Sequence, residues 1–238
     1  GVSEKIHIIT GGPGTGKSTI TKAILAITAK LTAKIILAAP TGRAAKRLTQ
    51  ITHKKAFTIH SLLEFDFIKG SFKKDQNNPL KCDLIIIDEA SMIDTMLMYY
   101  LLKALPDNCR ALFVGDIDQL PSVGPGYVLK DLLNAGIIKV TRLQEIFRQA
   151  AGSFIIANAH KINHGEFPDI LTPAWSDFQF IELQETEAIE AQIIELVNHK
   201  LPASGFHPID DVQILSPMKR GRLGTENLNI VLQTVLNP

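Results

Sequence analysis

Residues 11–19 read Gly-Gly-Pro-Gly-Thr-Gly-Lys-Ser-Thr, and this stretch decides the fold that the sequence predicts. It follows a short apolar run over residues 5–10. It precedes apolar residues spaced by four, three and four from Ile20 to Leu31, which is the spacing of one helix face. The stretch satisfies G-x-x-x-x-G-K-[ST] between a strand and a helix, so it predicts a phosphate-binding loop.

The chemistry of this loop depends on its residue types. Glycines let backbone N–H groups close around a β-phosphate, and the helix N-terminus adds the positive end of its dipole. Lys17 is expected to neutralise the β- and γ-phosphates, while the Ser18 hydroxyl ligates Mg²⁺. We therefore expect ATP and Mg²⁺ as cofactors. The expected nucleotide-binding residues are Gly12, Pro13, Gly14, Thr15, Gly16, Lys17, Ser18 and Thr19.

Two carboxylates follow a second apolar run, residues 84–87. This arrangement predicts Asp88 and Glu89 at the carboxyl end of a central strand, where ligands of open α/β sheets bind. Asp88 is expected to help hold Mg²⁺, and Glu89 to orient and deprotonate an attacking water. A second carboxylate beside the metal ligand favours nucleotide hydrolysis over a kinase reaction. Gln119, past the next apolar run, is suited either to sensing a γ-phosphate or to an ordinary polar loop.

Short apolar runs alternate with longer helical stretches, which predicts an α/β protein with a parallel sheet flanked by helices. Residues 64–80 differ, because their phenylalanines surround a Lys-Gly-Ser turn and indicate a hairpin followed by a loop. Further strands are expected at 34–39, 83–87, 111–115, 137–143, 179–183 and 211–215. Helices are expected at 44–51, 92–105, 126–134, 186–199 and 225–236.

Composition excludes several classes of protein. Hydrophobic residues make up 45% and charged residues 21%, which is inconsistent with wholesale disorder. No run reaches the roughly 18 apolar residues of a membrane helix, and we expect a cytoplasmic protein with no membrane partner. The two cysteines, Cys82 and Cys109, belong to no metal-binding pattern and indicate neither a disulfide scaffold nor a zinc site.

A net charge of +1 conceals an uneven distribution. Residues 5–63 contain ten basic residues and no Asp or Glu. A strongly basic first quarter indicates that one face binds a polyanion, or that it is a solvated basic surface.

These motifs together resemble the RecD-like helicases of superfamily 1, the group that contains the α subunit of exodeoxyribonuclease V. Residues 11–18 resemble helicase motif I, and residues 88–92 resemble motif II. Residues 115–126 are similar to motif III and are the most family-specific stretch. Residues 39–45 resemble motif Ia, residues 58–63 resemble a further DNA-contacting motif, and residues 147–149 resemble motif IV. Residues 215–229 resemble a segment associated with this family.

The resemblance implies an ATP-dependent DNA helicase core that moves 5′ to 3′ along single-stranded DNA and unwinds duplex junctions in recombination or repair. RecB-like and RecC-like subunits are implied as partners. Gln119 would couple the γ-phosphate to DNA contacts, and Arg148, otherwise a surface arginine, would act as an arginine finger. Residues 1–142 would form the first RecA-like domain, with the hairpin 64–80 as an insertion. Residues 143–238 would form part of a second RecA-like domain. Against the family pattern, the sequence shows no segment resembling motifs V and VI, and no glutamine motif ahead of the first strand.

The expected DNA-binding residues supply backbone N–H groups, basic side chains or short side-chain donors suited to phosphate contacts. They are Pro40, Thr41, Gly42, Arg43, Thr58, His60, Ser61, Lys219 and Arg220. On residue type alone, His60 is equally a core or surface histidine. Arg222 adds charge to the second cluster. Phe65, Phe67 and Phe72 of the hairpin either stack on DNA as part of a strand-separating pin or pack the hairpin onto its domain.

Other functions fit fewer of these residues. A P-loop enzyme of another class would hydrolyse or transfer phosphate without regard to DNA. An inactive nucleotide-binding module is disfavoured, because Lys17, Asp88 and Glu89 are all present. The helicase domain of a conjugative relaxase remains a neighbouring alternative. A nuclease is not indicated, since the sequence contains no Glu-x-Lys or Asp-x-Lys triplet.

Overall fold

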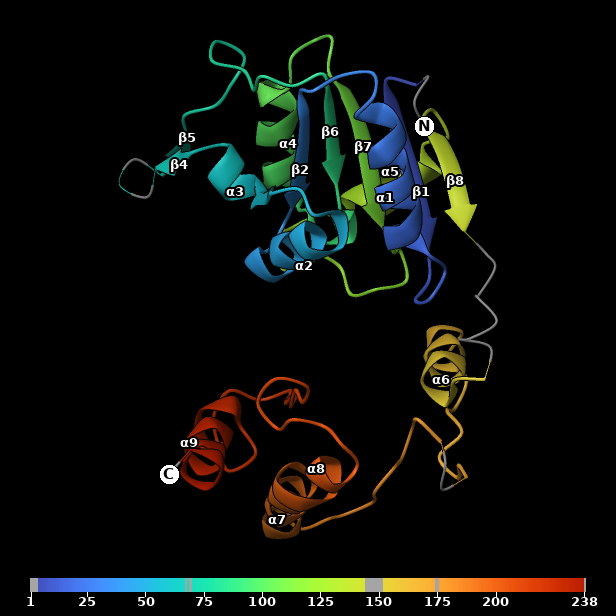
Figure 1. The fold of residues 1–238 in the computed structure, drawn as a ribbon, viewed down its shortest axis with the longest axis vertical. Coiled ribbons are helices and arrows are strands. Elements are labelled where there is room, and N and C mark those ends of the chain that lie inside the picture. The colour runs from blue at the N-terminus through green and yellow to red at the C-terminus, as the bar shows by residue number, and fades with distance from the viewer. Residues whose placement is uncertain (1–3, 67, 69, 144–151, 174–175, 238) are drawn as a thin grey trace. The chain divides into compact units, whose positions relative to one another are not determined.

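The computed structural model describes residues 4–66, 68, 70–143, 152–173 and 176–237. The chain divides into two compact units, Gly1–Phe178 and Gln179–Pro238, and each is considered by itself. The first unit contains the sheet, and the second contains helices (Figure 1). This division into compact units does not test the expectation that a second RecA-like domain begins at residue 143, which stays a prediction.

The first unit is built on a six-stranded parallel sheet in the order β3-β2-β6-β7-β1-β8. The parallel sheet expected from the sequence is confirmed. Five strands lie where apolar runs predict them, and only β3 lacks such a run. The strands are β1 (Ile6–Gly11), β2 (Ile35–Ala39), β3 (Ala56–Thr58), β6 (Leu84–Ile87), β7 (Arg110–Gly115) and β8 (Lys139–Leu143).

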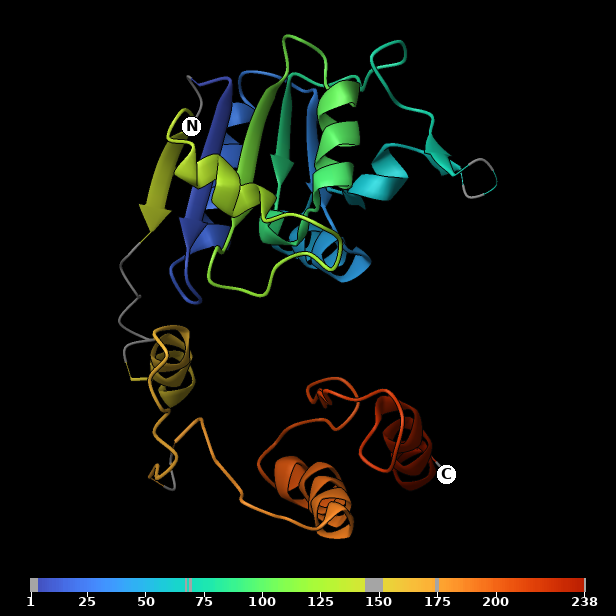
Figure 2. The same cartoon turned by 180° about the vertical axis from the view of Figure 1, so that it is seen from behind.

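Helices cover both faces of this sheet (Figures 1 and 2). Helices α1 (Lys17–Thr28) and α2 (Gly42–Thr52) cover one face, and α4 (Thr95–Ala104) and α5 (Val128–Asn134) cover the other. Successive side chains of a strand point to opposite faces, so each strand contributes to two cores. In β6, Ile86 packs on the α1 side while Ile85 and Ile87 pack on the α4 side, and all three are fully buried.

Smaller elements lie at the ends of the strands. Helix α3 (Ile59–Leu62) follows β3 directly, and β4 (Phe65–Asp66) pairs antiparallel with β5 (Ser71–Phe72) to form a hairpin. A 3-10 turn, η1 (Ala90–Met92), follows β6, and α6 (Phe154–Asn163) follows β8. The hairpin phenylalanines pack together, because the rings of Phe65 and Phe72 lie 4.8 Å apart and Phe72 also contacts Tyr100 at 4.8 Å.

The second unit contains α7 (Thr186–Glu195), a π-helical turn η2 (Leu196–Lys200), α8 (Leu201–Ala203) and α9 (Thr225–Leu236). The helices expected at 186–199 and 225–236 are present. The strands expected at 179–183 and 211–215 are wrong, since both segments are irregular. Phe180 and Leu215 are 53% and 83% exposed, so these short apolar runs have neither a paired strand nor a core against which to extend. In the described parts of the chain, no helix has the length and apolar character needed to cross a membrane.

Candidate nucleotide site and DNA-facing residues

The phosphate loop joins β1 to α1 in a conformation that requires glycine. Gly14 and Gly16 have φ values of 74° and 85°, in the left-handed region that side chains disfavour. Gly11 has no room for a side chain, since a β-carbon there would lie 2.7 Å from the Leu143 carbonyl oxygen. Thr15 closes the loop by donating from Oγ1 to the Gly12 carbonyl at 2.8 Å.

Lys17 begins α1 and extends its side chain back over the loop. Its Nζ donates to the carbonyl oxygens of Gly11 at 2.6 Å and Gly12 at 2.9 Å. Nζ also lies 3.6 Å from Oδ2 of Asp116, which follows β7 and is 1% exposed. Our sequence analysis did not select Asp116 as a site residue. The available signal was its position directly after a buried strand, the same position that marked Asp88.

Asp88 and Glu89 follow β6 at the same edge of the sheet. The Asp88 N–H donates to the Ala38 carbonyl at 3.0 Å, and the Asp88 carboxylate accepts from the Glu89 N–H at 3.0 Å. Glu89 has a φ of 52°, a conformation that costs a non-glycine residue about 1–3 kcal/mol. Strained backbone of this kind is common at functional sites.

Both carboxyl groups are harder to ionise than in water. Burial raises the pKa of Asp88, and the charges of Arg47 and Lys17 only partly oppose this effect. Burial also raises the pKa of Glu89, and the neighbouring Asp88 carboxylate raises it further. A carboxylate with a raised pKa is a stronger base, which suits Glu89 to accept a proton from water.

The site fits a polar ligand. Three side-chain atoms here are buried and have no hydrogen-bond partner among the described residues: Glu89 Oε2, Ser91 Oγ and Asp116 Oδ2. Unpaired buried polar atoms are costly, so this concentration marks a site for ligand or solvent contacts. Mg²⁺ is usually bound by one or two protein oxygens together with phosphate oxygens and waters, and Ser18 and Asp88 can supply those protein oxygens.

Gln119 lies beyond β7 with its side chain exposed, and its N–H donates to the Asp116 carbonyl at 3.4 Å. It lines a cavity of about 160 Å³ beside the phosphate loop. The other lining residues are Pro13, Asp116, Asp118, Ala159, His160 and Asn163. Arg148, the expected arginine finger, lies outside the described residues.

Two groups of expected DNA-binding residues lie on neighbouring strands. Ala39 of β2 pairs with Thr58 of β3, so residues 40–43 and 58–61 follow adjacent carboxyl ends of the sheet. Thr41 and Thr58 each cap the helix that follows, accepting from the N–H groups of Ala44 at 3.3 Å and Ser61 at 3.1 Å. These caps occupy a lone pair of each hydroxyl and leave its proton available to a phosphate.

His60 is exposed, and its ring lies 6.0 Å from that of Phe65 and 5.8 Å from that of Phe72. It therefore belongs to the aromatic packing that holds the hairpin. Phe67 lies outside the described residues.

The second basic cluster, Lys219, Arg220 and Arg222, lies in the second unit, and its members differ in their ion pairs. Arg222 forms ion pairs of 3.0 Å with both Glu187 and Glu190. Lys219 lies 3.6 Å from Glu226, while Arg220 has no ion-pair partner among the residues that the structure describes. Arg222 thus has a structural role in this unit, and Arg220 is the cation most available to a phosphate.

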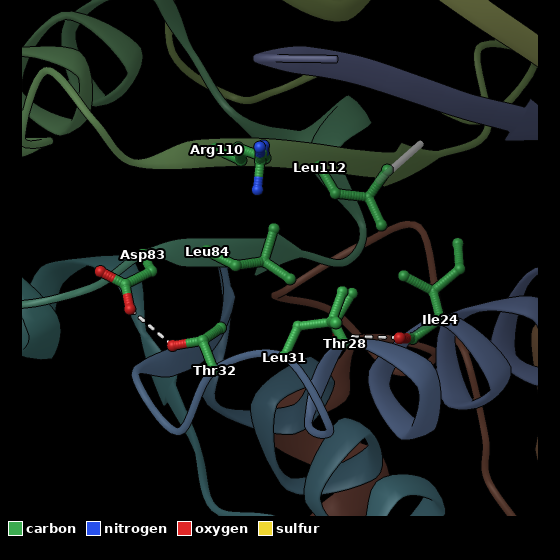
Figure 3. Close-up of a pocket in the computed structure, with 8 residues that line it drawn as sticks. All are labelled: Ile24, Thr28, Leu31, Thr32, Asp83, Leu84, Arg110 and Leu112. Carbon is green, nitrogen blue, oxygen red and sulfur yellow. Dashed lines mark hydrogen bonds between the residues drawn. The ribbon is translucent and has the colours of Figure 1, made fainter. Parts of the chain in front are cut away.

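A separate cavity of about 240 Å³ lies between the end of α1 and the amino ends of β6 and β7 (Figure 3). Its polar side is formed by Arg110 and by Asp83, which accepts a hydrogen bond from Thr32 at 2.5 Å. The phosphate loop lies at the carboxyl end of β1, which is the opposite edge of the sheet. We assign this cavity no part in nucleotide binding.

Comparison with known proteins agrees with this geometry. Residues 1–125 match the model of the AAA domain family, which covers more than half of the chain. The chain is 40% identical over 235 residues to the ATP-dependent RecD2 DNA helicase of Deinococcus radiodurans. It is 30% identical over 267 residues to the RecBCD enzyme subunit RecD of Mycolicibacterium smegmatis. The chain belongs to the AAA domain family, and its sequence is similar to those of RecD2 and RecD proteins.

The RecD-like chain covers only part of these relatives. Each alignment includes 98% of this chain, but 31% of the Deinococcus protein and 48% of the Mycolicibacterium protein. Among solved structures, the Pif1 helicase of Candida albicans is similar in fold. That match has a TM-score of 0.55 at 21% identity, and covers 82% of this chain and 51% of that one.

Proposed function

We propose that this RecD-like chain is the core of an ATP-driven motor that moves 5′ to 3′ on single-stranded DNA and unwinds duplex in recombination or repair. The observation that carries the proposal is the joining of two sites through one sheet. The Asp88 N–H donates to the Ala38 carbonyl, and the next residue of β2, Ala39, pairs with Thr58 of β3. The hydrolytic carboxylates are therefore one strand away from residues suited to DNA phosphates.

Each residue of the nucleotide site has a distinct task in this proposal. The loop N–H groups and Lys17 bind the phosphates of ATP, and Ser18 and Asp88 hold Mg²⁺. When bound, Mg²⁺ supplies positive charge that stabilises the developing charge on the phosphates. Glu89 orients water and takes its proton. We assign to Gln119 the sensing of the terminal phosphate, and its position on the cavity beside the phosphate loop supports this role.

Movement requires a second grip on the strand. We assign the first grip to Pro40, Thr41, Gly42, Arg43, Thr58, His60 and Ser61. We assign the second grip to Lys219 and Arg220, in a second RecA-like domain that begins at residue 143. Arg148 would stabilise the transition state as an arginine finger, which is worth on the order of 10³–10⁵ in rate. We expect the motor to work in the cytoplasm.

The β4–β5 hairpin is proposed as the pin that separates the strands. Phe65 and Phe72 are used for packing, whereas Ile68, between them in the sequence, is 98% exposed, so we assign contact with the duplex to the tip, residues 67–70. Deleting this tip should preserve DNA-stimulated ATP turnover and abolish unwinding. Unchanged unwinding would exclude the pin and leave the hairpin a packing element.

The proposed binding partners are inferred from the relatives named above. Single-stranded DNA and duplex junctions are the proposed substrates. The resemblance to RecD subunits also suggests assembly with RecB-like and RecC-like chains, whereas the resemblance to RecD2 suggests a helicase that acts alone. Copurification of the protein expressed from its complete gene, followed by mass spectrometry, separates the two cases.

The deciding experiment is ATP turnover by that protein with and without single-stranded DNA, using Lys17→Ala as the blank. We expect strong stimulation by DNA and background turnover in the blank. Turnover that does not respond to DNA would reject the motor and favour a P-loop NTPase of another class. Stimulation of ATP turnover by DNA without directional unwinding would favour another DNA-dependent ATPase. A nicking domain elsewhere in the gene would identify a relaxase.

A further inference from the structure

His160 lies on α6, outside every motif discussed so far. Its ring is partly buried, and its Nε2 atom is shielded from solvent without a hydrogen-bond partner among the described residues. The ring faces the phosphate loop. Its Cε1 and Nε2 atoms lie 3.4 Å and 4.0 Å from the point that a β-carbon on Gly12 would occupy. A glycine at position 12 therefore leaves open space between the loop and this imidazole.

The surroundings of His160 locate it relative to the nucleotide site. It lines the cavity of about 160 Å³ together with Pro13 of the loop and Gln119. Asp116 lines the same cavity and lies 3.6 Å from Lys17 Nζ, the group expected to neutralise the terminal phosphates. The cavity is thus next to the terminal-phosphate end of the loop.

An unpaired imidazole nitrogen in such a place indicates a ligand. A buried donor or acceptor left without a partner costs about 1–3 kcal/mol, so residues are seldom held this way unless another group satisfies them. Glu89 Oε2 has the same property in the same site. Both atoms can be satisfied by groups that enter with the nucleotide and its bound water.

We propose that His160 binds the terminal phosphate of ATP, with Nε2–H donating a hydrogen bond to a phosphate oxygen. This inference rests on the proposed ATPase function and adds a nucleotide contact from a helix beyond β8. ADP lacks the terminal phosphate, so the contact distinguishes the two nucleotides. A contact with different affinity for the ATP and ADP states is what a motor needs to bias α6 between two arrangements.

The test compares three substitutions in the protein expressed from its complete gene. His160→Ala removes the ring, His160→Phe keeps an aromatic ring but removes the donor, and His160→Gln supplies a different N–H donor. His199→Ala is the matched control, because His199 is an exposed histidine of the second unit that contacts Glu195 and Asn198 and no residue of the nucleotide site. Fluorescent ADP and a non-hydrolysable ATP analogue serve as binding probes, and DNA-stimulated turnover is measured in parallel.

We expect His160→Ala and His160→Phe to bind the ATP analogue about tenfold more weakly, the size of one charge-assisted hydrogen bond. Their ADP affinity should stay within about twofold of the unsubstituted protein, as should every property of His199→Ala. His160→Gln should recover part of the lost affinity. Normal analogue binding by His160→Phe would overturn the proposal by assigning the ring to packing. Equal losses for both nucleotides would also overturn it.

Failure of this inference is distinguishable from failure of the proposed function. If the unsubstituted protein hydrolyses ATP and Lys17→Ala does not, the ATPase assignment holds whatever the histidine variants do. If neither protein binds nucleotide, both proposals fail together. Far-UV circular dichroism and thermal melting check that each variant is folded. If His160→Ala does not fold, the binding result for His160→Phe decides the test.

Discussion

The ammonium group of Lys17 lies 3.6 Å from Oδ2 of Asp116, a carboxylate with only 1% of its surface exposed. The other oxygen of Asp116 accepts from the Asp118 N–H at 3.0 Å, which fixes the carboxylate in place. A phosphate that binds Lys17 must therefore compete with a rigid, buried negative charge. We therefore expect Asp116 to lower the affinity for polyanions while it orients the lysine.

Asp116→Asn should tighten nucleotide binding. The amide keeps the shape and the bond from Asp118 but removes the charge that opposes phosphate. Two unit charges about 4 Å apart interact by about 1 kcal/mol in water and by about 4 kcal/mol at an effective dielectric constant of about 20, so removing one nearby charge should raise the affinity at least several-fold. Isothermal titration with ADP measures the change. Asp107→Asn is the matched control, since Asp107 is exposed and precedes β7 at the opposite edge of the sheet, and weaker binding by Asp116→Asn would refute this electrostatic role.

Glu89→Gln should retain nucleotide binding and lose hydrolysis. The amide cannot accept the proton of water, and removing a general base lowers turnover by about 10²–10⁴-fold. Lys17→Ala should instead weaken both binding and turnover. Equilibrium binding of a fluorescent nucleotide and steady-state phosphate release separate the two outcomes. Normal turnover by Glu89→Gln would show that another group is the base.

The raised pKa of Glu89 sets the direction of two pH effects. Only the ionised carboxylate accepts a proton, so turnover should rise as pH increases through this raised pKa and then level off. The same shift makes the folded state bind more protons than the unfolded state above pH 4.5, the ordinary value. The free energy of unfolding contributed by Glu89 is therefore greatest below that value, and it decreases as pH rises through the folded-state pKa.

Glu89→Gln removes this contribution. The variant should be more stable than the unsubstituted protein at pH 8, by about 1 kcal/mol, because an ionised oxygen no longer lies buried without a partner. At pH 4 the difference should shrink. Urea unfolding at the two pH values measures it, and an unchanged difference would assign the stability effect to something other than ionisation.

The fold could be predicted because its core strands are continuous apolar runs. Ile85, Ile86 and Ile87 are buried on both faces of the sheet, and such strands are recognisable without neighbours. The phosphate loop was equally recognisable, since Gly14 and Gly16 are needed for their positive φ. Strand β3 has three residues and depends on its pairing with β2, which sequence periodicity does not record.

The site was predicted less completely than the fold. Asp116 and His160 enter it through contacts between segments far apart in the sequence. The ion pair from Asp116 joins the end of β7 to the start of α1, and His160 approaches the loop from α6. The opposite error arose at residues 179–183, where an apolar run has no partner strand and stays irregular. Local patterns identify groups that a motif holds together, and only tertiary packing identifies the others.

Gly115→Ala should destabilise the turn that carries Glu89. A β-carbon at position 115 would lie 2.7 Å from Cδ2 of Leu129 and 3.1 Å from the Ser91 nitrogen. Overpacking of this kind costs about 1–3 kcal/mol. Adding Leu129→Ala should relieve one clash, so the double variant should lose less stability than the sum of the single variants, with a coupling of about 0.5–3 kcal/mol. Gly152→Ala is the control, because a β-carbon there meets nothing within 4 Å. Additive losses in thermal melts would reject the predicted clash.

Arg220 and Arg222 should differ in their effect on DNA binding, although they are two residues apart. Arg222 is held by Glu187 and Glu190 at 3.0 Å each, so Arg222→Ala should leave DNA affinity nearly unchanged and reduce stability by up to about 1 kcal/mol. Arg220 is exposed, and each phosphate contact on a single strand contributes about 0.7 to the slope of log affinity against log salt. Arg220→Ala should therefore reduce that slope by about 0.7. Fluorescence anisotropy with a labelled oligonucleotide at several salt concentrations measures both variants, and equal slopes would remove Arg220 from the second grip.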